Sequence, residues 1–202
     1  MVDEFTERFA AEAAGLVVGD PAAPETQVGP LARADLRDTL DDQVRRAVAA
    51  GARVVTGGQV GPRPGAWYEP TVLTGLVTDS PVLLEETFGP VAAIVPVADD
   101  EAAVAVANCT RYGLAASVWS RDSRRALSVG RRIRSGALFV NSVAASDPRL
   151  PFGGVKDSGY GRELGRAGLK EFVNVRTYVL GSAPVAAEPG TKWLPGRSSG
   201  VD

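Results

Sequence analysis

Histidine is absent from the 202-residue sequence, and cysteine occurs only once, at position 109. Without histidine the chain cannot form a Ser-His-Asp or Cys-His catalytic group or a histidine-ligated metal site. A single cysteine excludes an intrachain disulfide and a cysteine-rich zinc site, so no metal is expected. A chain without disulfides is compatible with the cytoplasm, which is the location we expect.

The sequence also lacks an excess of charge of either sign. Its 22 Lys and Arg against 24 Asp and Glu give a net charge of -2, so neither a nucleic-acid partner nor a membrane partner is expected. No apolar run reaches the ~18 residues that suggest a membrane helix, and the acidic N-terminus does not resemble a signal sequence. With 45% hydrophobic and 23% charged residues, the composition is globular.

Apolar periodicity and turn residues divide the chain into alternating helices and strands. Helices are expected at 2–14, 32–50, 99–108, 122–133 and 162–173, with a helical turn at 80–86. Extended segments are expected at 16–18, 53–56, 67–76, 91–97, 114–120, 137–140 and 174–180. This alternation predicts an α/β fold with a mostly parallel sheet covered by helices. Residues 1–180 form the predicted domain, and the Pro/Gly/Ser-rich residues 181–202, with Trp193, form a tail.

A first candidate site is the run Glu85-Glu86-Thr87-Phe88-Gly89-Pro90, just before an apolar strand. A carboxylate at the edge of an α/β sheet can accept hydrogen bonds from ribose hydroxyls, and an adjacent aromatic ring can pack on a nicotinamide. The alternative is that both glutamates end a turn and Phe88 fills the core. The residue pattern leaves both interpretations open.

A second candidate site is the loop at 141–161. Its second half contains Pro151-Phe152-Gly153-Gly154 and Gly159-Tyr160-Gly161, and Arg162-Glu163 follow directly. Loops of this length inside a domain are usually functional. Phe152 could form a pocket wall, and Ser146, Arg149 and Lys156 could bind a carboxylate. A purely structural role for the glycines, which allow close backbone approach, is the alternative.

Three other features favour structural roles. Gly57-Gly58 lacks the GxGxxG spacing of a dinucleotide site and predicts a turn. Cys109 lies at the C-terminal end of a predicted helix, where the negative dipole disfavours a thiolate, so we interpret it as a small buried hydrophobe. The arginines between 121 and 134 predict a solvated helix face.

Taken together, the segments resemble the C-terminal, catalytic-domain portion of the NAD(P)-dependent aldehyde dehydrogenase superfamily. The resemblance covers about residues 1–180. The matching runs, in order, are Val18-Gly19-Asp20-Pro21, Gly29-Pro30-Leu31, Gly51-Ala52, Gly57-Gly58, Tyr68-Glu69-Pro70-Thr71, Glu85 to Val91, Tyr112 to Val118, Gly136 with Asn141, and Pro151 to Glu163. Residues 146–151 are most similar to the succinate-semialdehyde dehydrogenase branch.

The resemblance implies oxidation of an aldehyde to an acid with NAD or NADP as the cofactor, and we expect the isolated chain to bind this cofactor weakly or not at all. It implies that Glu86 holds the nicotinamide ribose and that Phe88 lies at the nicotinamide. Ser146 is implied as a contact for a distal substrate carboxylate, Phe152 as a wall of the substrate tunnel, and Asn141 as a support of the site. No residue of this chain matches the nucleophilic cysteine, the general base or the oxyanion asparagine, so no catalytic residue is expected in it.

Three hypotheses follow from this resemblance. The chain is part of a dehydrogenase that is inactive alone and depends on a complementary N-terminal polypeptide. Alternatively, it is a pseudoenzyme used for binding or assembly, including as a homo-oligomer. In the third hypothesis, the scaffold serves a non-redox reaction, with acid/base groups drawn from Glu86, Asp147, Lys156 and Tyr160.

Overall fold

The computed structural model describes residues 1–179 and 181, which alternate between helices and short strands. The helices are α1 (Val2–Ala14), α2 (Ala34–Ala49), α3 (Pro81–Leu84), α4 (Asp100–Cys109), α5 (Ser123–Gly130) and α6 (Gly165–Glu171). The strands are β1 (Arg53–Thr56), β2 (Thr71–Thr74), β3 (Val91–Ala93), β4 (Tyr112–Gly113), β5 (Ala115–Val118), β6 (Ala137–Val140) and β7 (Val155–Lys156). The predicted α/β class is confirmed.

The strands pair into small sheets that contain both directions. Sheet β1-β2-β3 has an antiparallel β1–β2 pair and a parallel β2–β3 pair. Strands β5 and β6 are parallel, and β4 and β7 are antiparallel. Two of the four pairs are parallel, as the sequence predicts, and the two antiparallel pairs make the sheets mixed rather than mostly parallel.

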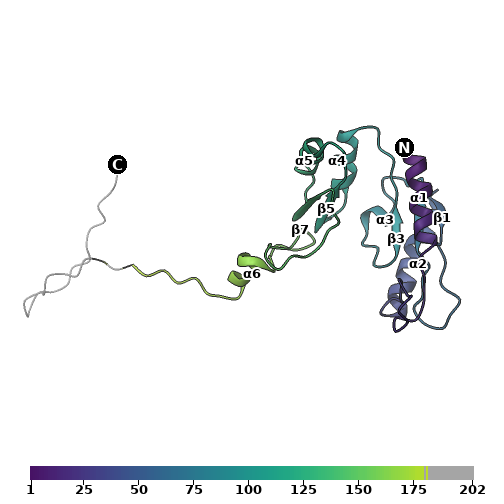
Figure 1. Ribbon diagram of the computed structural model, residues 1–202, viewed down its shortest axis with the longest axis horizontal. Coiled ribbons are helices and arrows are strands. Elements are labelled where there is room, and N and C mark those ends of the chain that lie inside the picture. Colours follow the sequence, from purple (N-terminus) through teal and green to yellow (C-terminus); the bar gives the residue numbers. More distant parts are fainter. Residues whose placement is uncertain (180, 182–202) are drawn as a thin grey trace, which may run out of the picture.

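Apart from α6, the elements gather into two groups along the chain. Figure 1 shows α1, α2, α3, β1 and β3 together at one end, α4, α5, β5 and β7 beside them, and α6 further along. Contacts agree with this grouping, because α1 packs on β1 and β2 whereas α5 packs on β5 and β6. The segment that joins α3 to β3 therefore lies in the first group.

The best-packed core lies under α2. Leu40, Val44 and Ala47 are each at most 2% exposed and share one face of the helix, as their spacing predicts. They pack against Tyr68 and Leu73, which come from the chain around β2. This core fixes α2 relative to β2 and α3, so polar side chains on the same helix face also have fixed positions.

The apolar face of α1 is less buried than its pattern predicts. Ala10 is buried, but the Phe5 and Phe9 side chains are 53% and 40% exposed. Their ring centroids lie 5.7 Å apart, so the two aromatics contact each other rather than the interior. The helix itself has the predicted bounds.

The predicted strand at 91–97 is shorter in the structure and ends at Ala93. It pairs with β2 in the register Thr71↔Val91 to Leu73↔Ala93, and the Ile94 N–H still donates to the Leu73 carbonyl. Because β2 itself ends at Thr74, the apolar residues after 94 have no neighbouring strand among the described residues.

The C-terminal helix starts later than predicted. Leu164 has a φ of 61°, which is outside the helical region, so α6 begins at Gly165 rather than at residue 162. The strand predicted at 174–180 is wrong for residues 174–179, which form no strand pair. Extended propensity alone does not make a strand when no partner edge is adjacent. Residues 182–202 of the predicted tail, with Trp193, lie outside the described residues.

The long loop after β6 contains the short strand β7, which the sequence did not predict. It brings Gly153 against Gly136, where an added Cβ would lie 1.7 Å from the Gly153 carbonyl oxygen. These glycines thus permit close backbone approach, which is the structural alternative given above for the glycines of this loop. Gly57 also forms the predicted turn, with a φ of 70°.

Candidate functional site

The Glu85–Pro90 segment joins α3 to β3 and has little regular hydrogen bonding of its own. The Glu85 N–H donates to the Pro81 carbonyl at 2.8 Å, which ends α3. The Gly89 N–H donates to the Thr87 carbonyl at 3.1 Å, which closes a tight turn before β3. Gly89 sits against Leu40, because an added Cβ would come within 2.3 Å of the Leu40 Cδ2 atom. The turn therefore lies directly on the α2 core.

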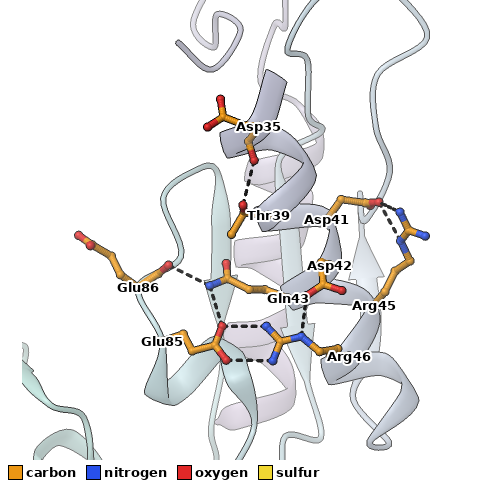
Figure 2. A network of polar contacts seen from close by, with 9 residues as sticks. All are labelled: Asp35, Thr39, Asp41, Asp42, Gln43, Arg45, Arg46, Glu85 and Glu86. Carbon is orange, nitrogen blue, oxygen red and sulfur yellow. Dashed lines mark hydrogen bonds and ion pairs between the residues drawn. The ribbon is translucent and has the colours of Figure 1, made fainter. Parts of the chain in front are cut away.

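Polar side chains of α2 hold the start of this segment (Figure 2). The Arg46 guanidinium donates to both carboxylate oxygens of Glu85, at 2.9 and 2.8 Å, and also to Asp42 at 2.7 Å. The Gln43 amide donates to Glu85 at 3.1 Å and to the Glu86 carbonyl at 3.0 Å. Hydrogen bonds from Arg46 first, and then from Gln43, lower the pKa of Glu85 to about 2.

With its carbonyl held in this way, Glu86 lines a cavity of about 530 Å³. The other walls come from the end of α4, from β4 and β5, and from the chain before β6, and they include Thr110, Ser117, Arg134 and Ser135. The Glu86 side chain is exposed there. A carboxylate in such a cavity can accept hydrogen bonds from a ligand's hydroxyls.

Phe88 lies elsewhere. Its side chain is 65% exposed and lines a separate hollow of about 260 Å³ with Pro30, Leu31 and Leu36. The structure does not bring it together with Glu86 in one cavity. It also does not fill the core, which was the alternative reading of the sequence. Its nicotinamide contact remains a prediction.

Asn141 follows β6 and joins it to the end of β5. Its side-chain oxygen accepts from the Ser120 N–H at 2.8 Å, and its amide donates to the Ser120 carbonyl at 2.9 Å. Its φ of 53° is in the left-handed region, which asparagine tolerates better than most residues. These contacts join the carboxyl ends of two parallel strands, and the role of Asn141 as a support of the site remains a prediction that rests on the resemblance.

Ser146 and Phe152, the two predicted substrate contacts, lie in the loop after β6. Ser146 is exposed. Phe152 is half-buried, and its backbone exchanges two 2.8 Å hydrogen bonds with Glu163. Neither lines the cavity that contains Glu86. Their substrate roles remain predictions that rest on the resemblance.

The basic and acidic candidates of the same loop have structural partners. Arg149 pairs with Asp147, at 2.6 Å between the closest atoms. The Lys156 ammonium donates to the Asn108 and Thr110 carbonyls, at 3.3 and 3.0 Å, at the end of α4. Tyr160 is fully exposed. These residues and Glu86 therefore do not form the acid/base group of the non-redox hypothesis.

Cys109 is exposed, so the sequence-based interpretation of a buried hydrophobe is wrong. It is the last residue of α4, whose one buried residue is Val104. It is not among the residues that line the cavity with Glu86, although Ala107 and Thr110 are.

The described part of the chain holds neither a metal-ligand cluster nor a membrane-spanning helix. No group of three His, Cys, Asp or Glu side chains is arranged to hold a metal ion. None of the described helices combines the length and apolar character needed to cross a membrane.

Gln43 and Arg46 are site residues that the sequence reasoning missed. Gln43 is 3% exposed and lies three residues after Leu40, inside the apolar face of α2. A polar residue within an apolar helical stripe usually has a buried hydrogen-bond partner, and this was the available signal. The partner could not be named because it lies more than 40 residues away in sequence.

Comparison with known proteins gives a consistent family match. The model of the aldehyde dehydrogenase family matches residues 1–178. The chain is 43% identical to succinate-semialdehyde dehydrogenase [NADP(+)] 1 of Mycobacterium ulcerans (strain Agy99), over 89% of this chain and 39% of that protein. It is 46% identical to succinate semialdehyde dehydrogenase [NAD(P)+] Sad of Escherichia coli (strain K12), over 86% of this chain and 37% of that protein.

A solved structure agrees. Succinic semialdehyde dehydrogenase from Streptococcus pyogenes, in complex with NADP+, superposes with a TM-score of 0.83 at 40% identity. The match covers 88% of this chain and 39% of that one. The chain thus spans 37–39% of the length of these relatives.

Proposed function

Because the chain belongs to the aldehyde dehydrogenase family, we propose that it supplies part of the catalytic domain of an NAD(P)-dependent aldehyde dehydrogenase. The proposed substrate is succinate semialdehyde, since curated relatives at 43% and 46% identity carry that name. The product is the corresponding carboxylic acid. The proposed location is the cytoplasm, where thiols are kept reduced.

The observation that carries the proposal is the position of Glu86. Glu86 lines a cavity whose other lining residues include serine and threonine, and hydrogen bonds from α2 fix the adjacent segment. In the proposed enzyme this carboxylate accepts hydrogen bonds from the hydroxyls of the nicotinamide ribose. The cofactor supplies the hydride acceptor of the reaction.

In the proposed enzyme, the reacting thiolate belongs to a residue outside these 202 residues. The resemblance implies that a thiolate attacks the aldehyde carbon, that hydride leaves this carbon, and that water hydrolyses the resulting thioester to release acid and thiol. The one thiol of this chain, Cys109, does not line the cavity with Glu86. The chain is therefore proposed to be inactive alone and to work with a complementary polypeptide.

A reconstitution experiment tests this proposal. The complement is the part of the Mycobacterium ulcerans relative outside its match with this chain, added as a separate polypeptide or fused in one chimera. NADPH or NADH formation from succinate semialdehyde is followed for the chain alone, the complement alone, the mixture and the chimera. We expect a rate only where both parts are present. Equal rates for the complement with and without this chain, in both formats, would refute the proposal.

A second candidate function, assembly with a partner, is favoured by exposed apolar side chains. Those near the C-terminal end of the described chain are 90% exposed at Phe172, 85% at Val175 and 73% at Tyr178. Exposed apolar surface of this kind usually marks an interface. Light scattering tests the homo-oligomer, and a strictly monomeric chain that also fails to bind the complement argues against assembly.

A further inference from the structure

The Glu86 backbone is held by a single side chain of α2. Gln43 donates to the Glu86 carbonyl at 3.0 Å, and this is the one hydrogen bond to the Glu86 backbone among the described residues. The neighbouring residues 87–90 form a turn rather than a strand. The direction of the Glu86 side chain therefore depends on this contact.

Gln43 is itself fixed. It is 3% exposed and lies on the same helix face as Leu40, Val44 and Ala47. Its amide nitrogen reaches both Glu85 and Glu86, so the amide is oriented by two acceptors. Its buried amide oxygen has no hydrogen-bond partner in the described chain. Burying an amide oxygen without a hydrogen-bond partner costs free energy of folding, and a group buried in this way is typically retained for a specific contact.

Arg46 completes the attachment. It lies three residues further along α2 and grips Glu85 through two parallel hydrogen bonds, while Asp42 accepts a third from the same guanidinium. Two-point arginine–carboxylate pairing fixes orientation as well as distance. With Glu85 held on one side, the Glu86 carboxylate points away from α2, as Figure 2 shows, and lines the cavity.

We propose that Gln43, assisted by Arg46, is a positioning residue that sets where the Glu86 carboxylate meets the cofactor ribose. This inference rests on the proposed function. In this role Gln43 acts through its hydrogen bonds to the Glu86 carbonyl and to Glu85, and not by direct contact with cofactor or substrate. Its loss is expected to weaken cofactor binding while the chemistry of the aldehyde is unaffected.

A double-mutant cycle in the reconstituted enzyme tests the inference. Gln43→Met keeps the side-chain length but removes both donated hydrogen bonds. We expect the KM for NADP+ to rise about tenfold, the effect of one or two lost hydrogen bonds, with kcat changed less than twofold. In a Glu86→Gln background, Gln43→Met is expected to add little. Full additivity of the two effects would overturn the inference.

The matched control is Thr39→Val. It also removes a side-chain hydrogen bond from α2, donated to the Asp35 carbonyl at 2.9 Å, but it does not touch the Glu85–Pro90 segment. We expect its KM for NADP+ to match that of the parent. A rise equal to that of Gln43→Met would mean that general loosening of α2 explains the result, and would overturn the inference.

Hydrogen exchange of the 202-residue chain separates failure of the inference from failure of the proposed function. Gln43→Met is expected to speed exchange in residues 85–90 about tenfold, with α2 unchanged, and Thr39→Val is expected to leave residues 85–90 as in the parent. Absence of activity in the unsubstituted enzyme counts against the proposed function alone. Unchanged exchange at 85–90 in Gln43→Met overturns the inference whether or not activity is present.

Discussion

Replacing Leu40 by alanine is expected to remove a large part of the stability of the first group of elements. Leu40 is 1% exposed, and its Cδ2 atom covers Gly89 in the turn next to Glu86. Three buried carbons at about 0.8 kcal/mol each give about 2.4 kcal/mol of lost transfer free energy. Because the packed core holds α2 in place, the space left by the removed atoms stays unfilled, and this raises the total loss of stability to about 3–5 kcal/mol.

Urea unfolding followed by tryptophan fluorescence measures this loss. The control is Leu169→Ala on α6, where the side chain is 73% exposed and the expected change is under about 0.5 kcal/mol. The denaturant slope is expected to be the same in both variants. If the free energy of unfolding of Leu40→Ala lies within about 0.5 kcal/mol of the parent value, Leu40 is not part of a packed core under α2.

Three further predictions concern stability. Since the pKa of Glu85 falls from 4.5 to about 2, mainly through Arg46, its ion pair stabilises the fold above pH 4.5 and that contribution is lost as pH falls through about 2. Glu85→Gln should therefore flatten the pH dependence of the Tm across this interval, and an unchanged profile contradicts the pairing. Gly136→Ala should lower the free energy of unfolding by more than about 1 kcal/mol, because the added Cβ meets the Gly153 carbonyl. The control is Gly161→Ala, whose added Cβ has no atom within 4 Å. Equal unfolding midpoints for the two variants would count against the close approach. Cys109→Ser should change the free energy of unfolding by less than about 0.5 kcal/mol, and the native thiol should react readily with a thiol reagent; a protected thiol refutes its exposure.

The sequence predicts local structure best where spacing and end signals agree. The helix at Val2–Ala14 and the strands at Arg53–Thr56 and Ala137–Val140 have the predicted bounds. Asp99 and Asp122 cap α4 and α5 by accepting backbone N–H groups, as expected of residues before a helix. Strand ends were predicted less well, because they depend on a neighbour's length, as at β3.

The candidate site was predictable only in part, because its members are remote in sequence. The glutamate pair was recognisable as a local run, but the choice between Glu85 as an anchored residue and Glu86 as a free carboxylate depends on Gln43 and Arg46. The interpretation of Cys109 as a buried hydrophobe rested on its place at the end of a predicted helix, whereas its exposure depends on how that helix packs in the fold.

The central claim, that Glu86 holds the cofactor ribose, is tested most directly by one comparison in the reconstituted enzyme. The KM for NADP+ is measured for Glu86→Gln and for Glu25→Gln, the same chemical change at an exposed residue between α1 and α2. A hydrogen bond to a charged acceptor contributes about 1.5–3 kcal/mol, so Glu86→Gln is expected to raise this KM at least about tenfold and Glu25→Gln to leave it unchanged. Equal values for the two variants would contradict the account.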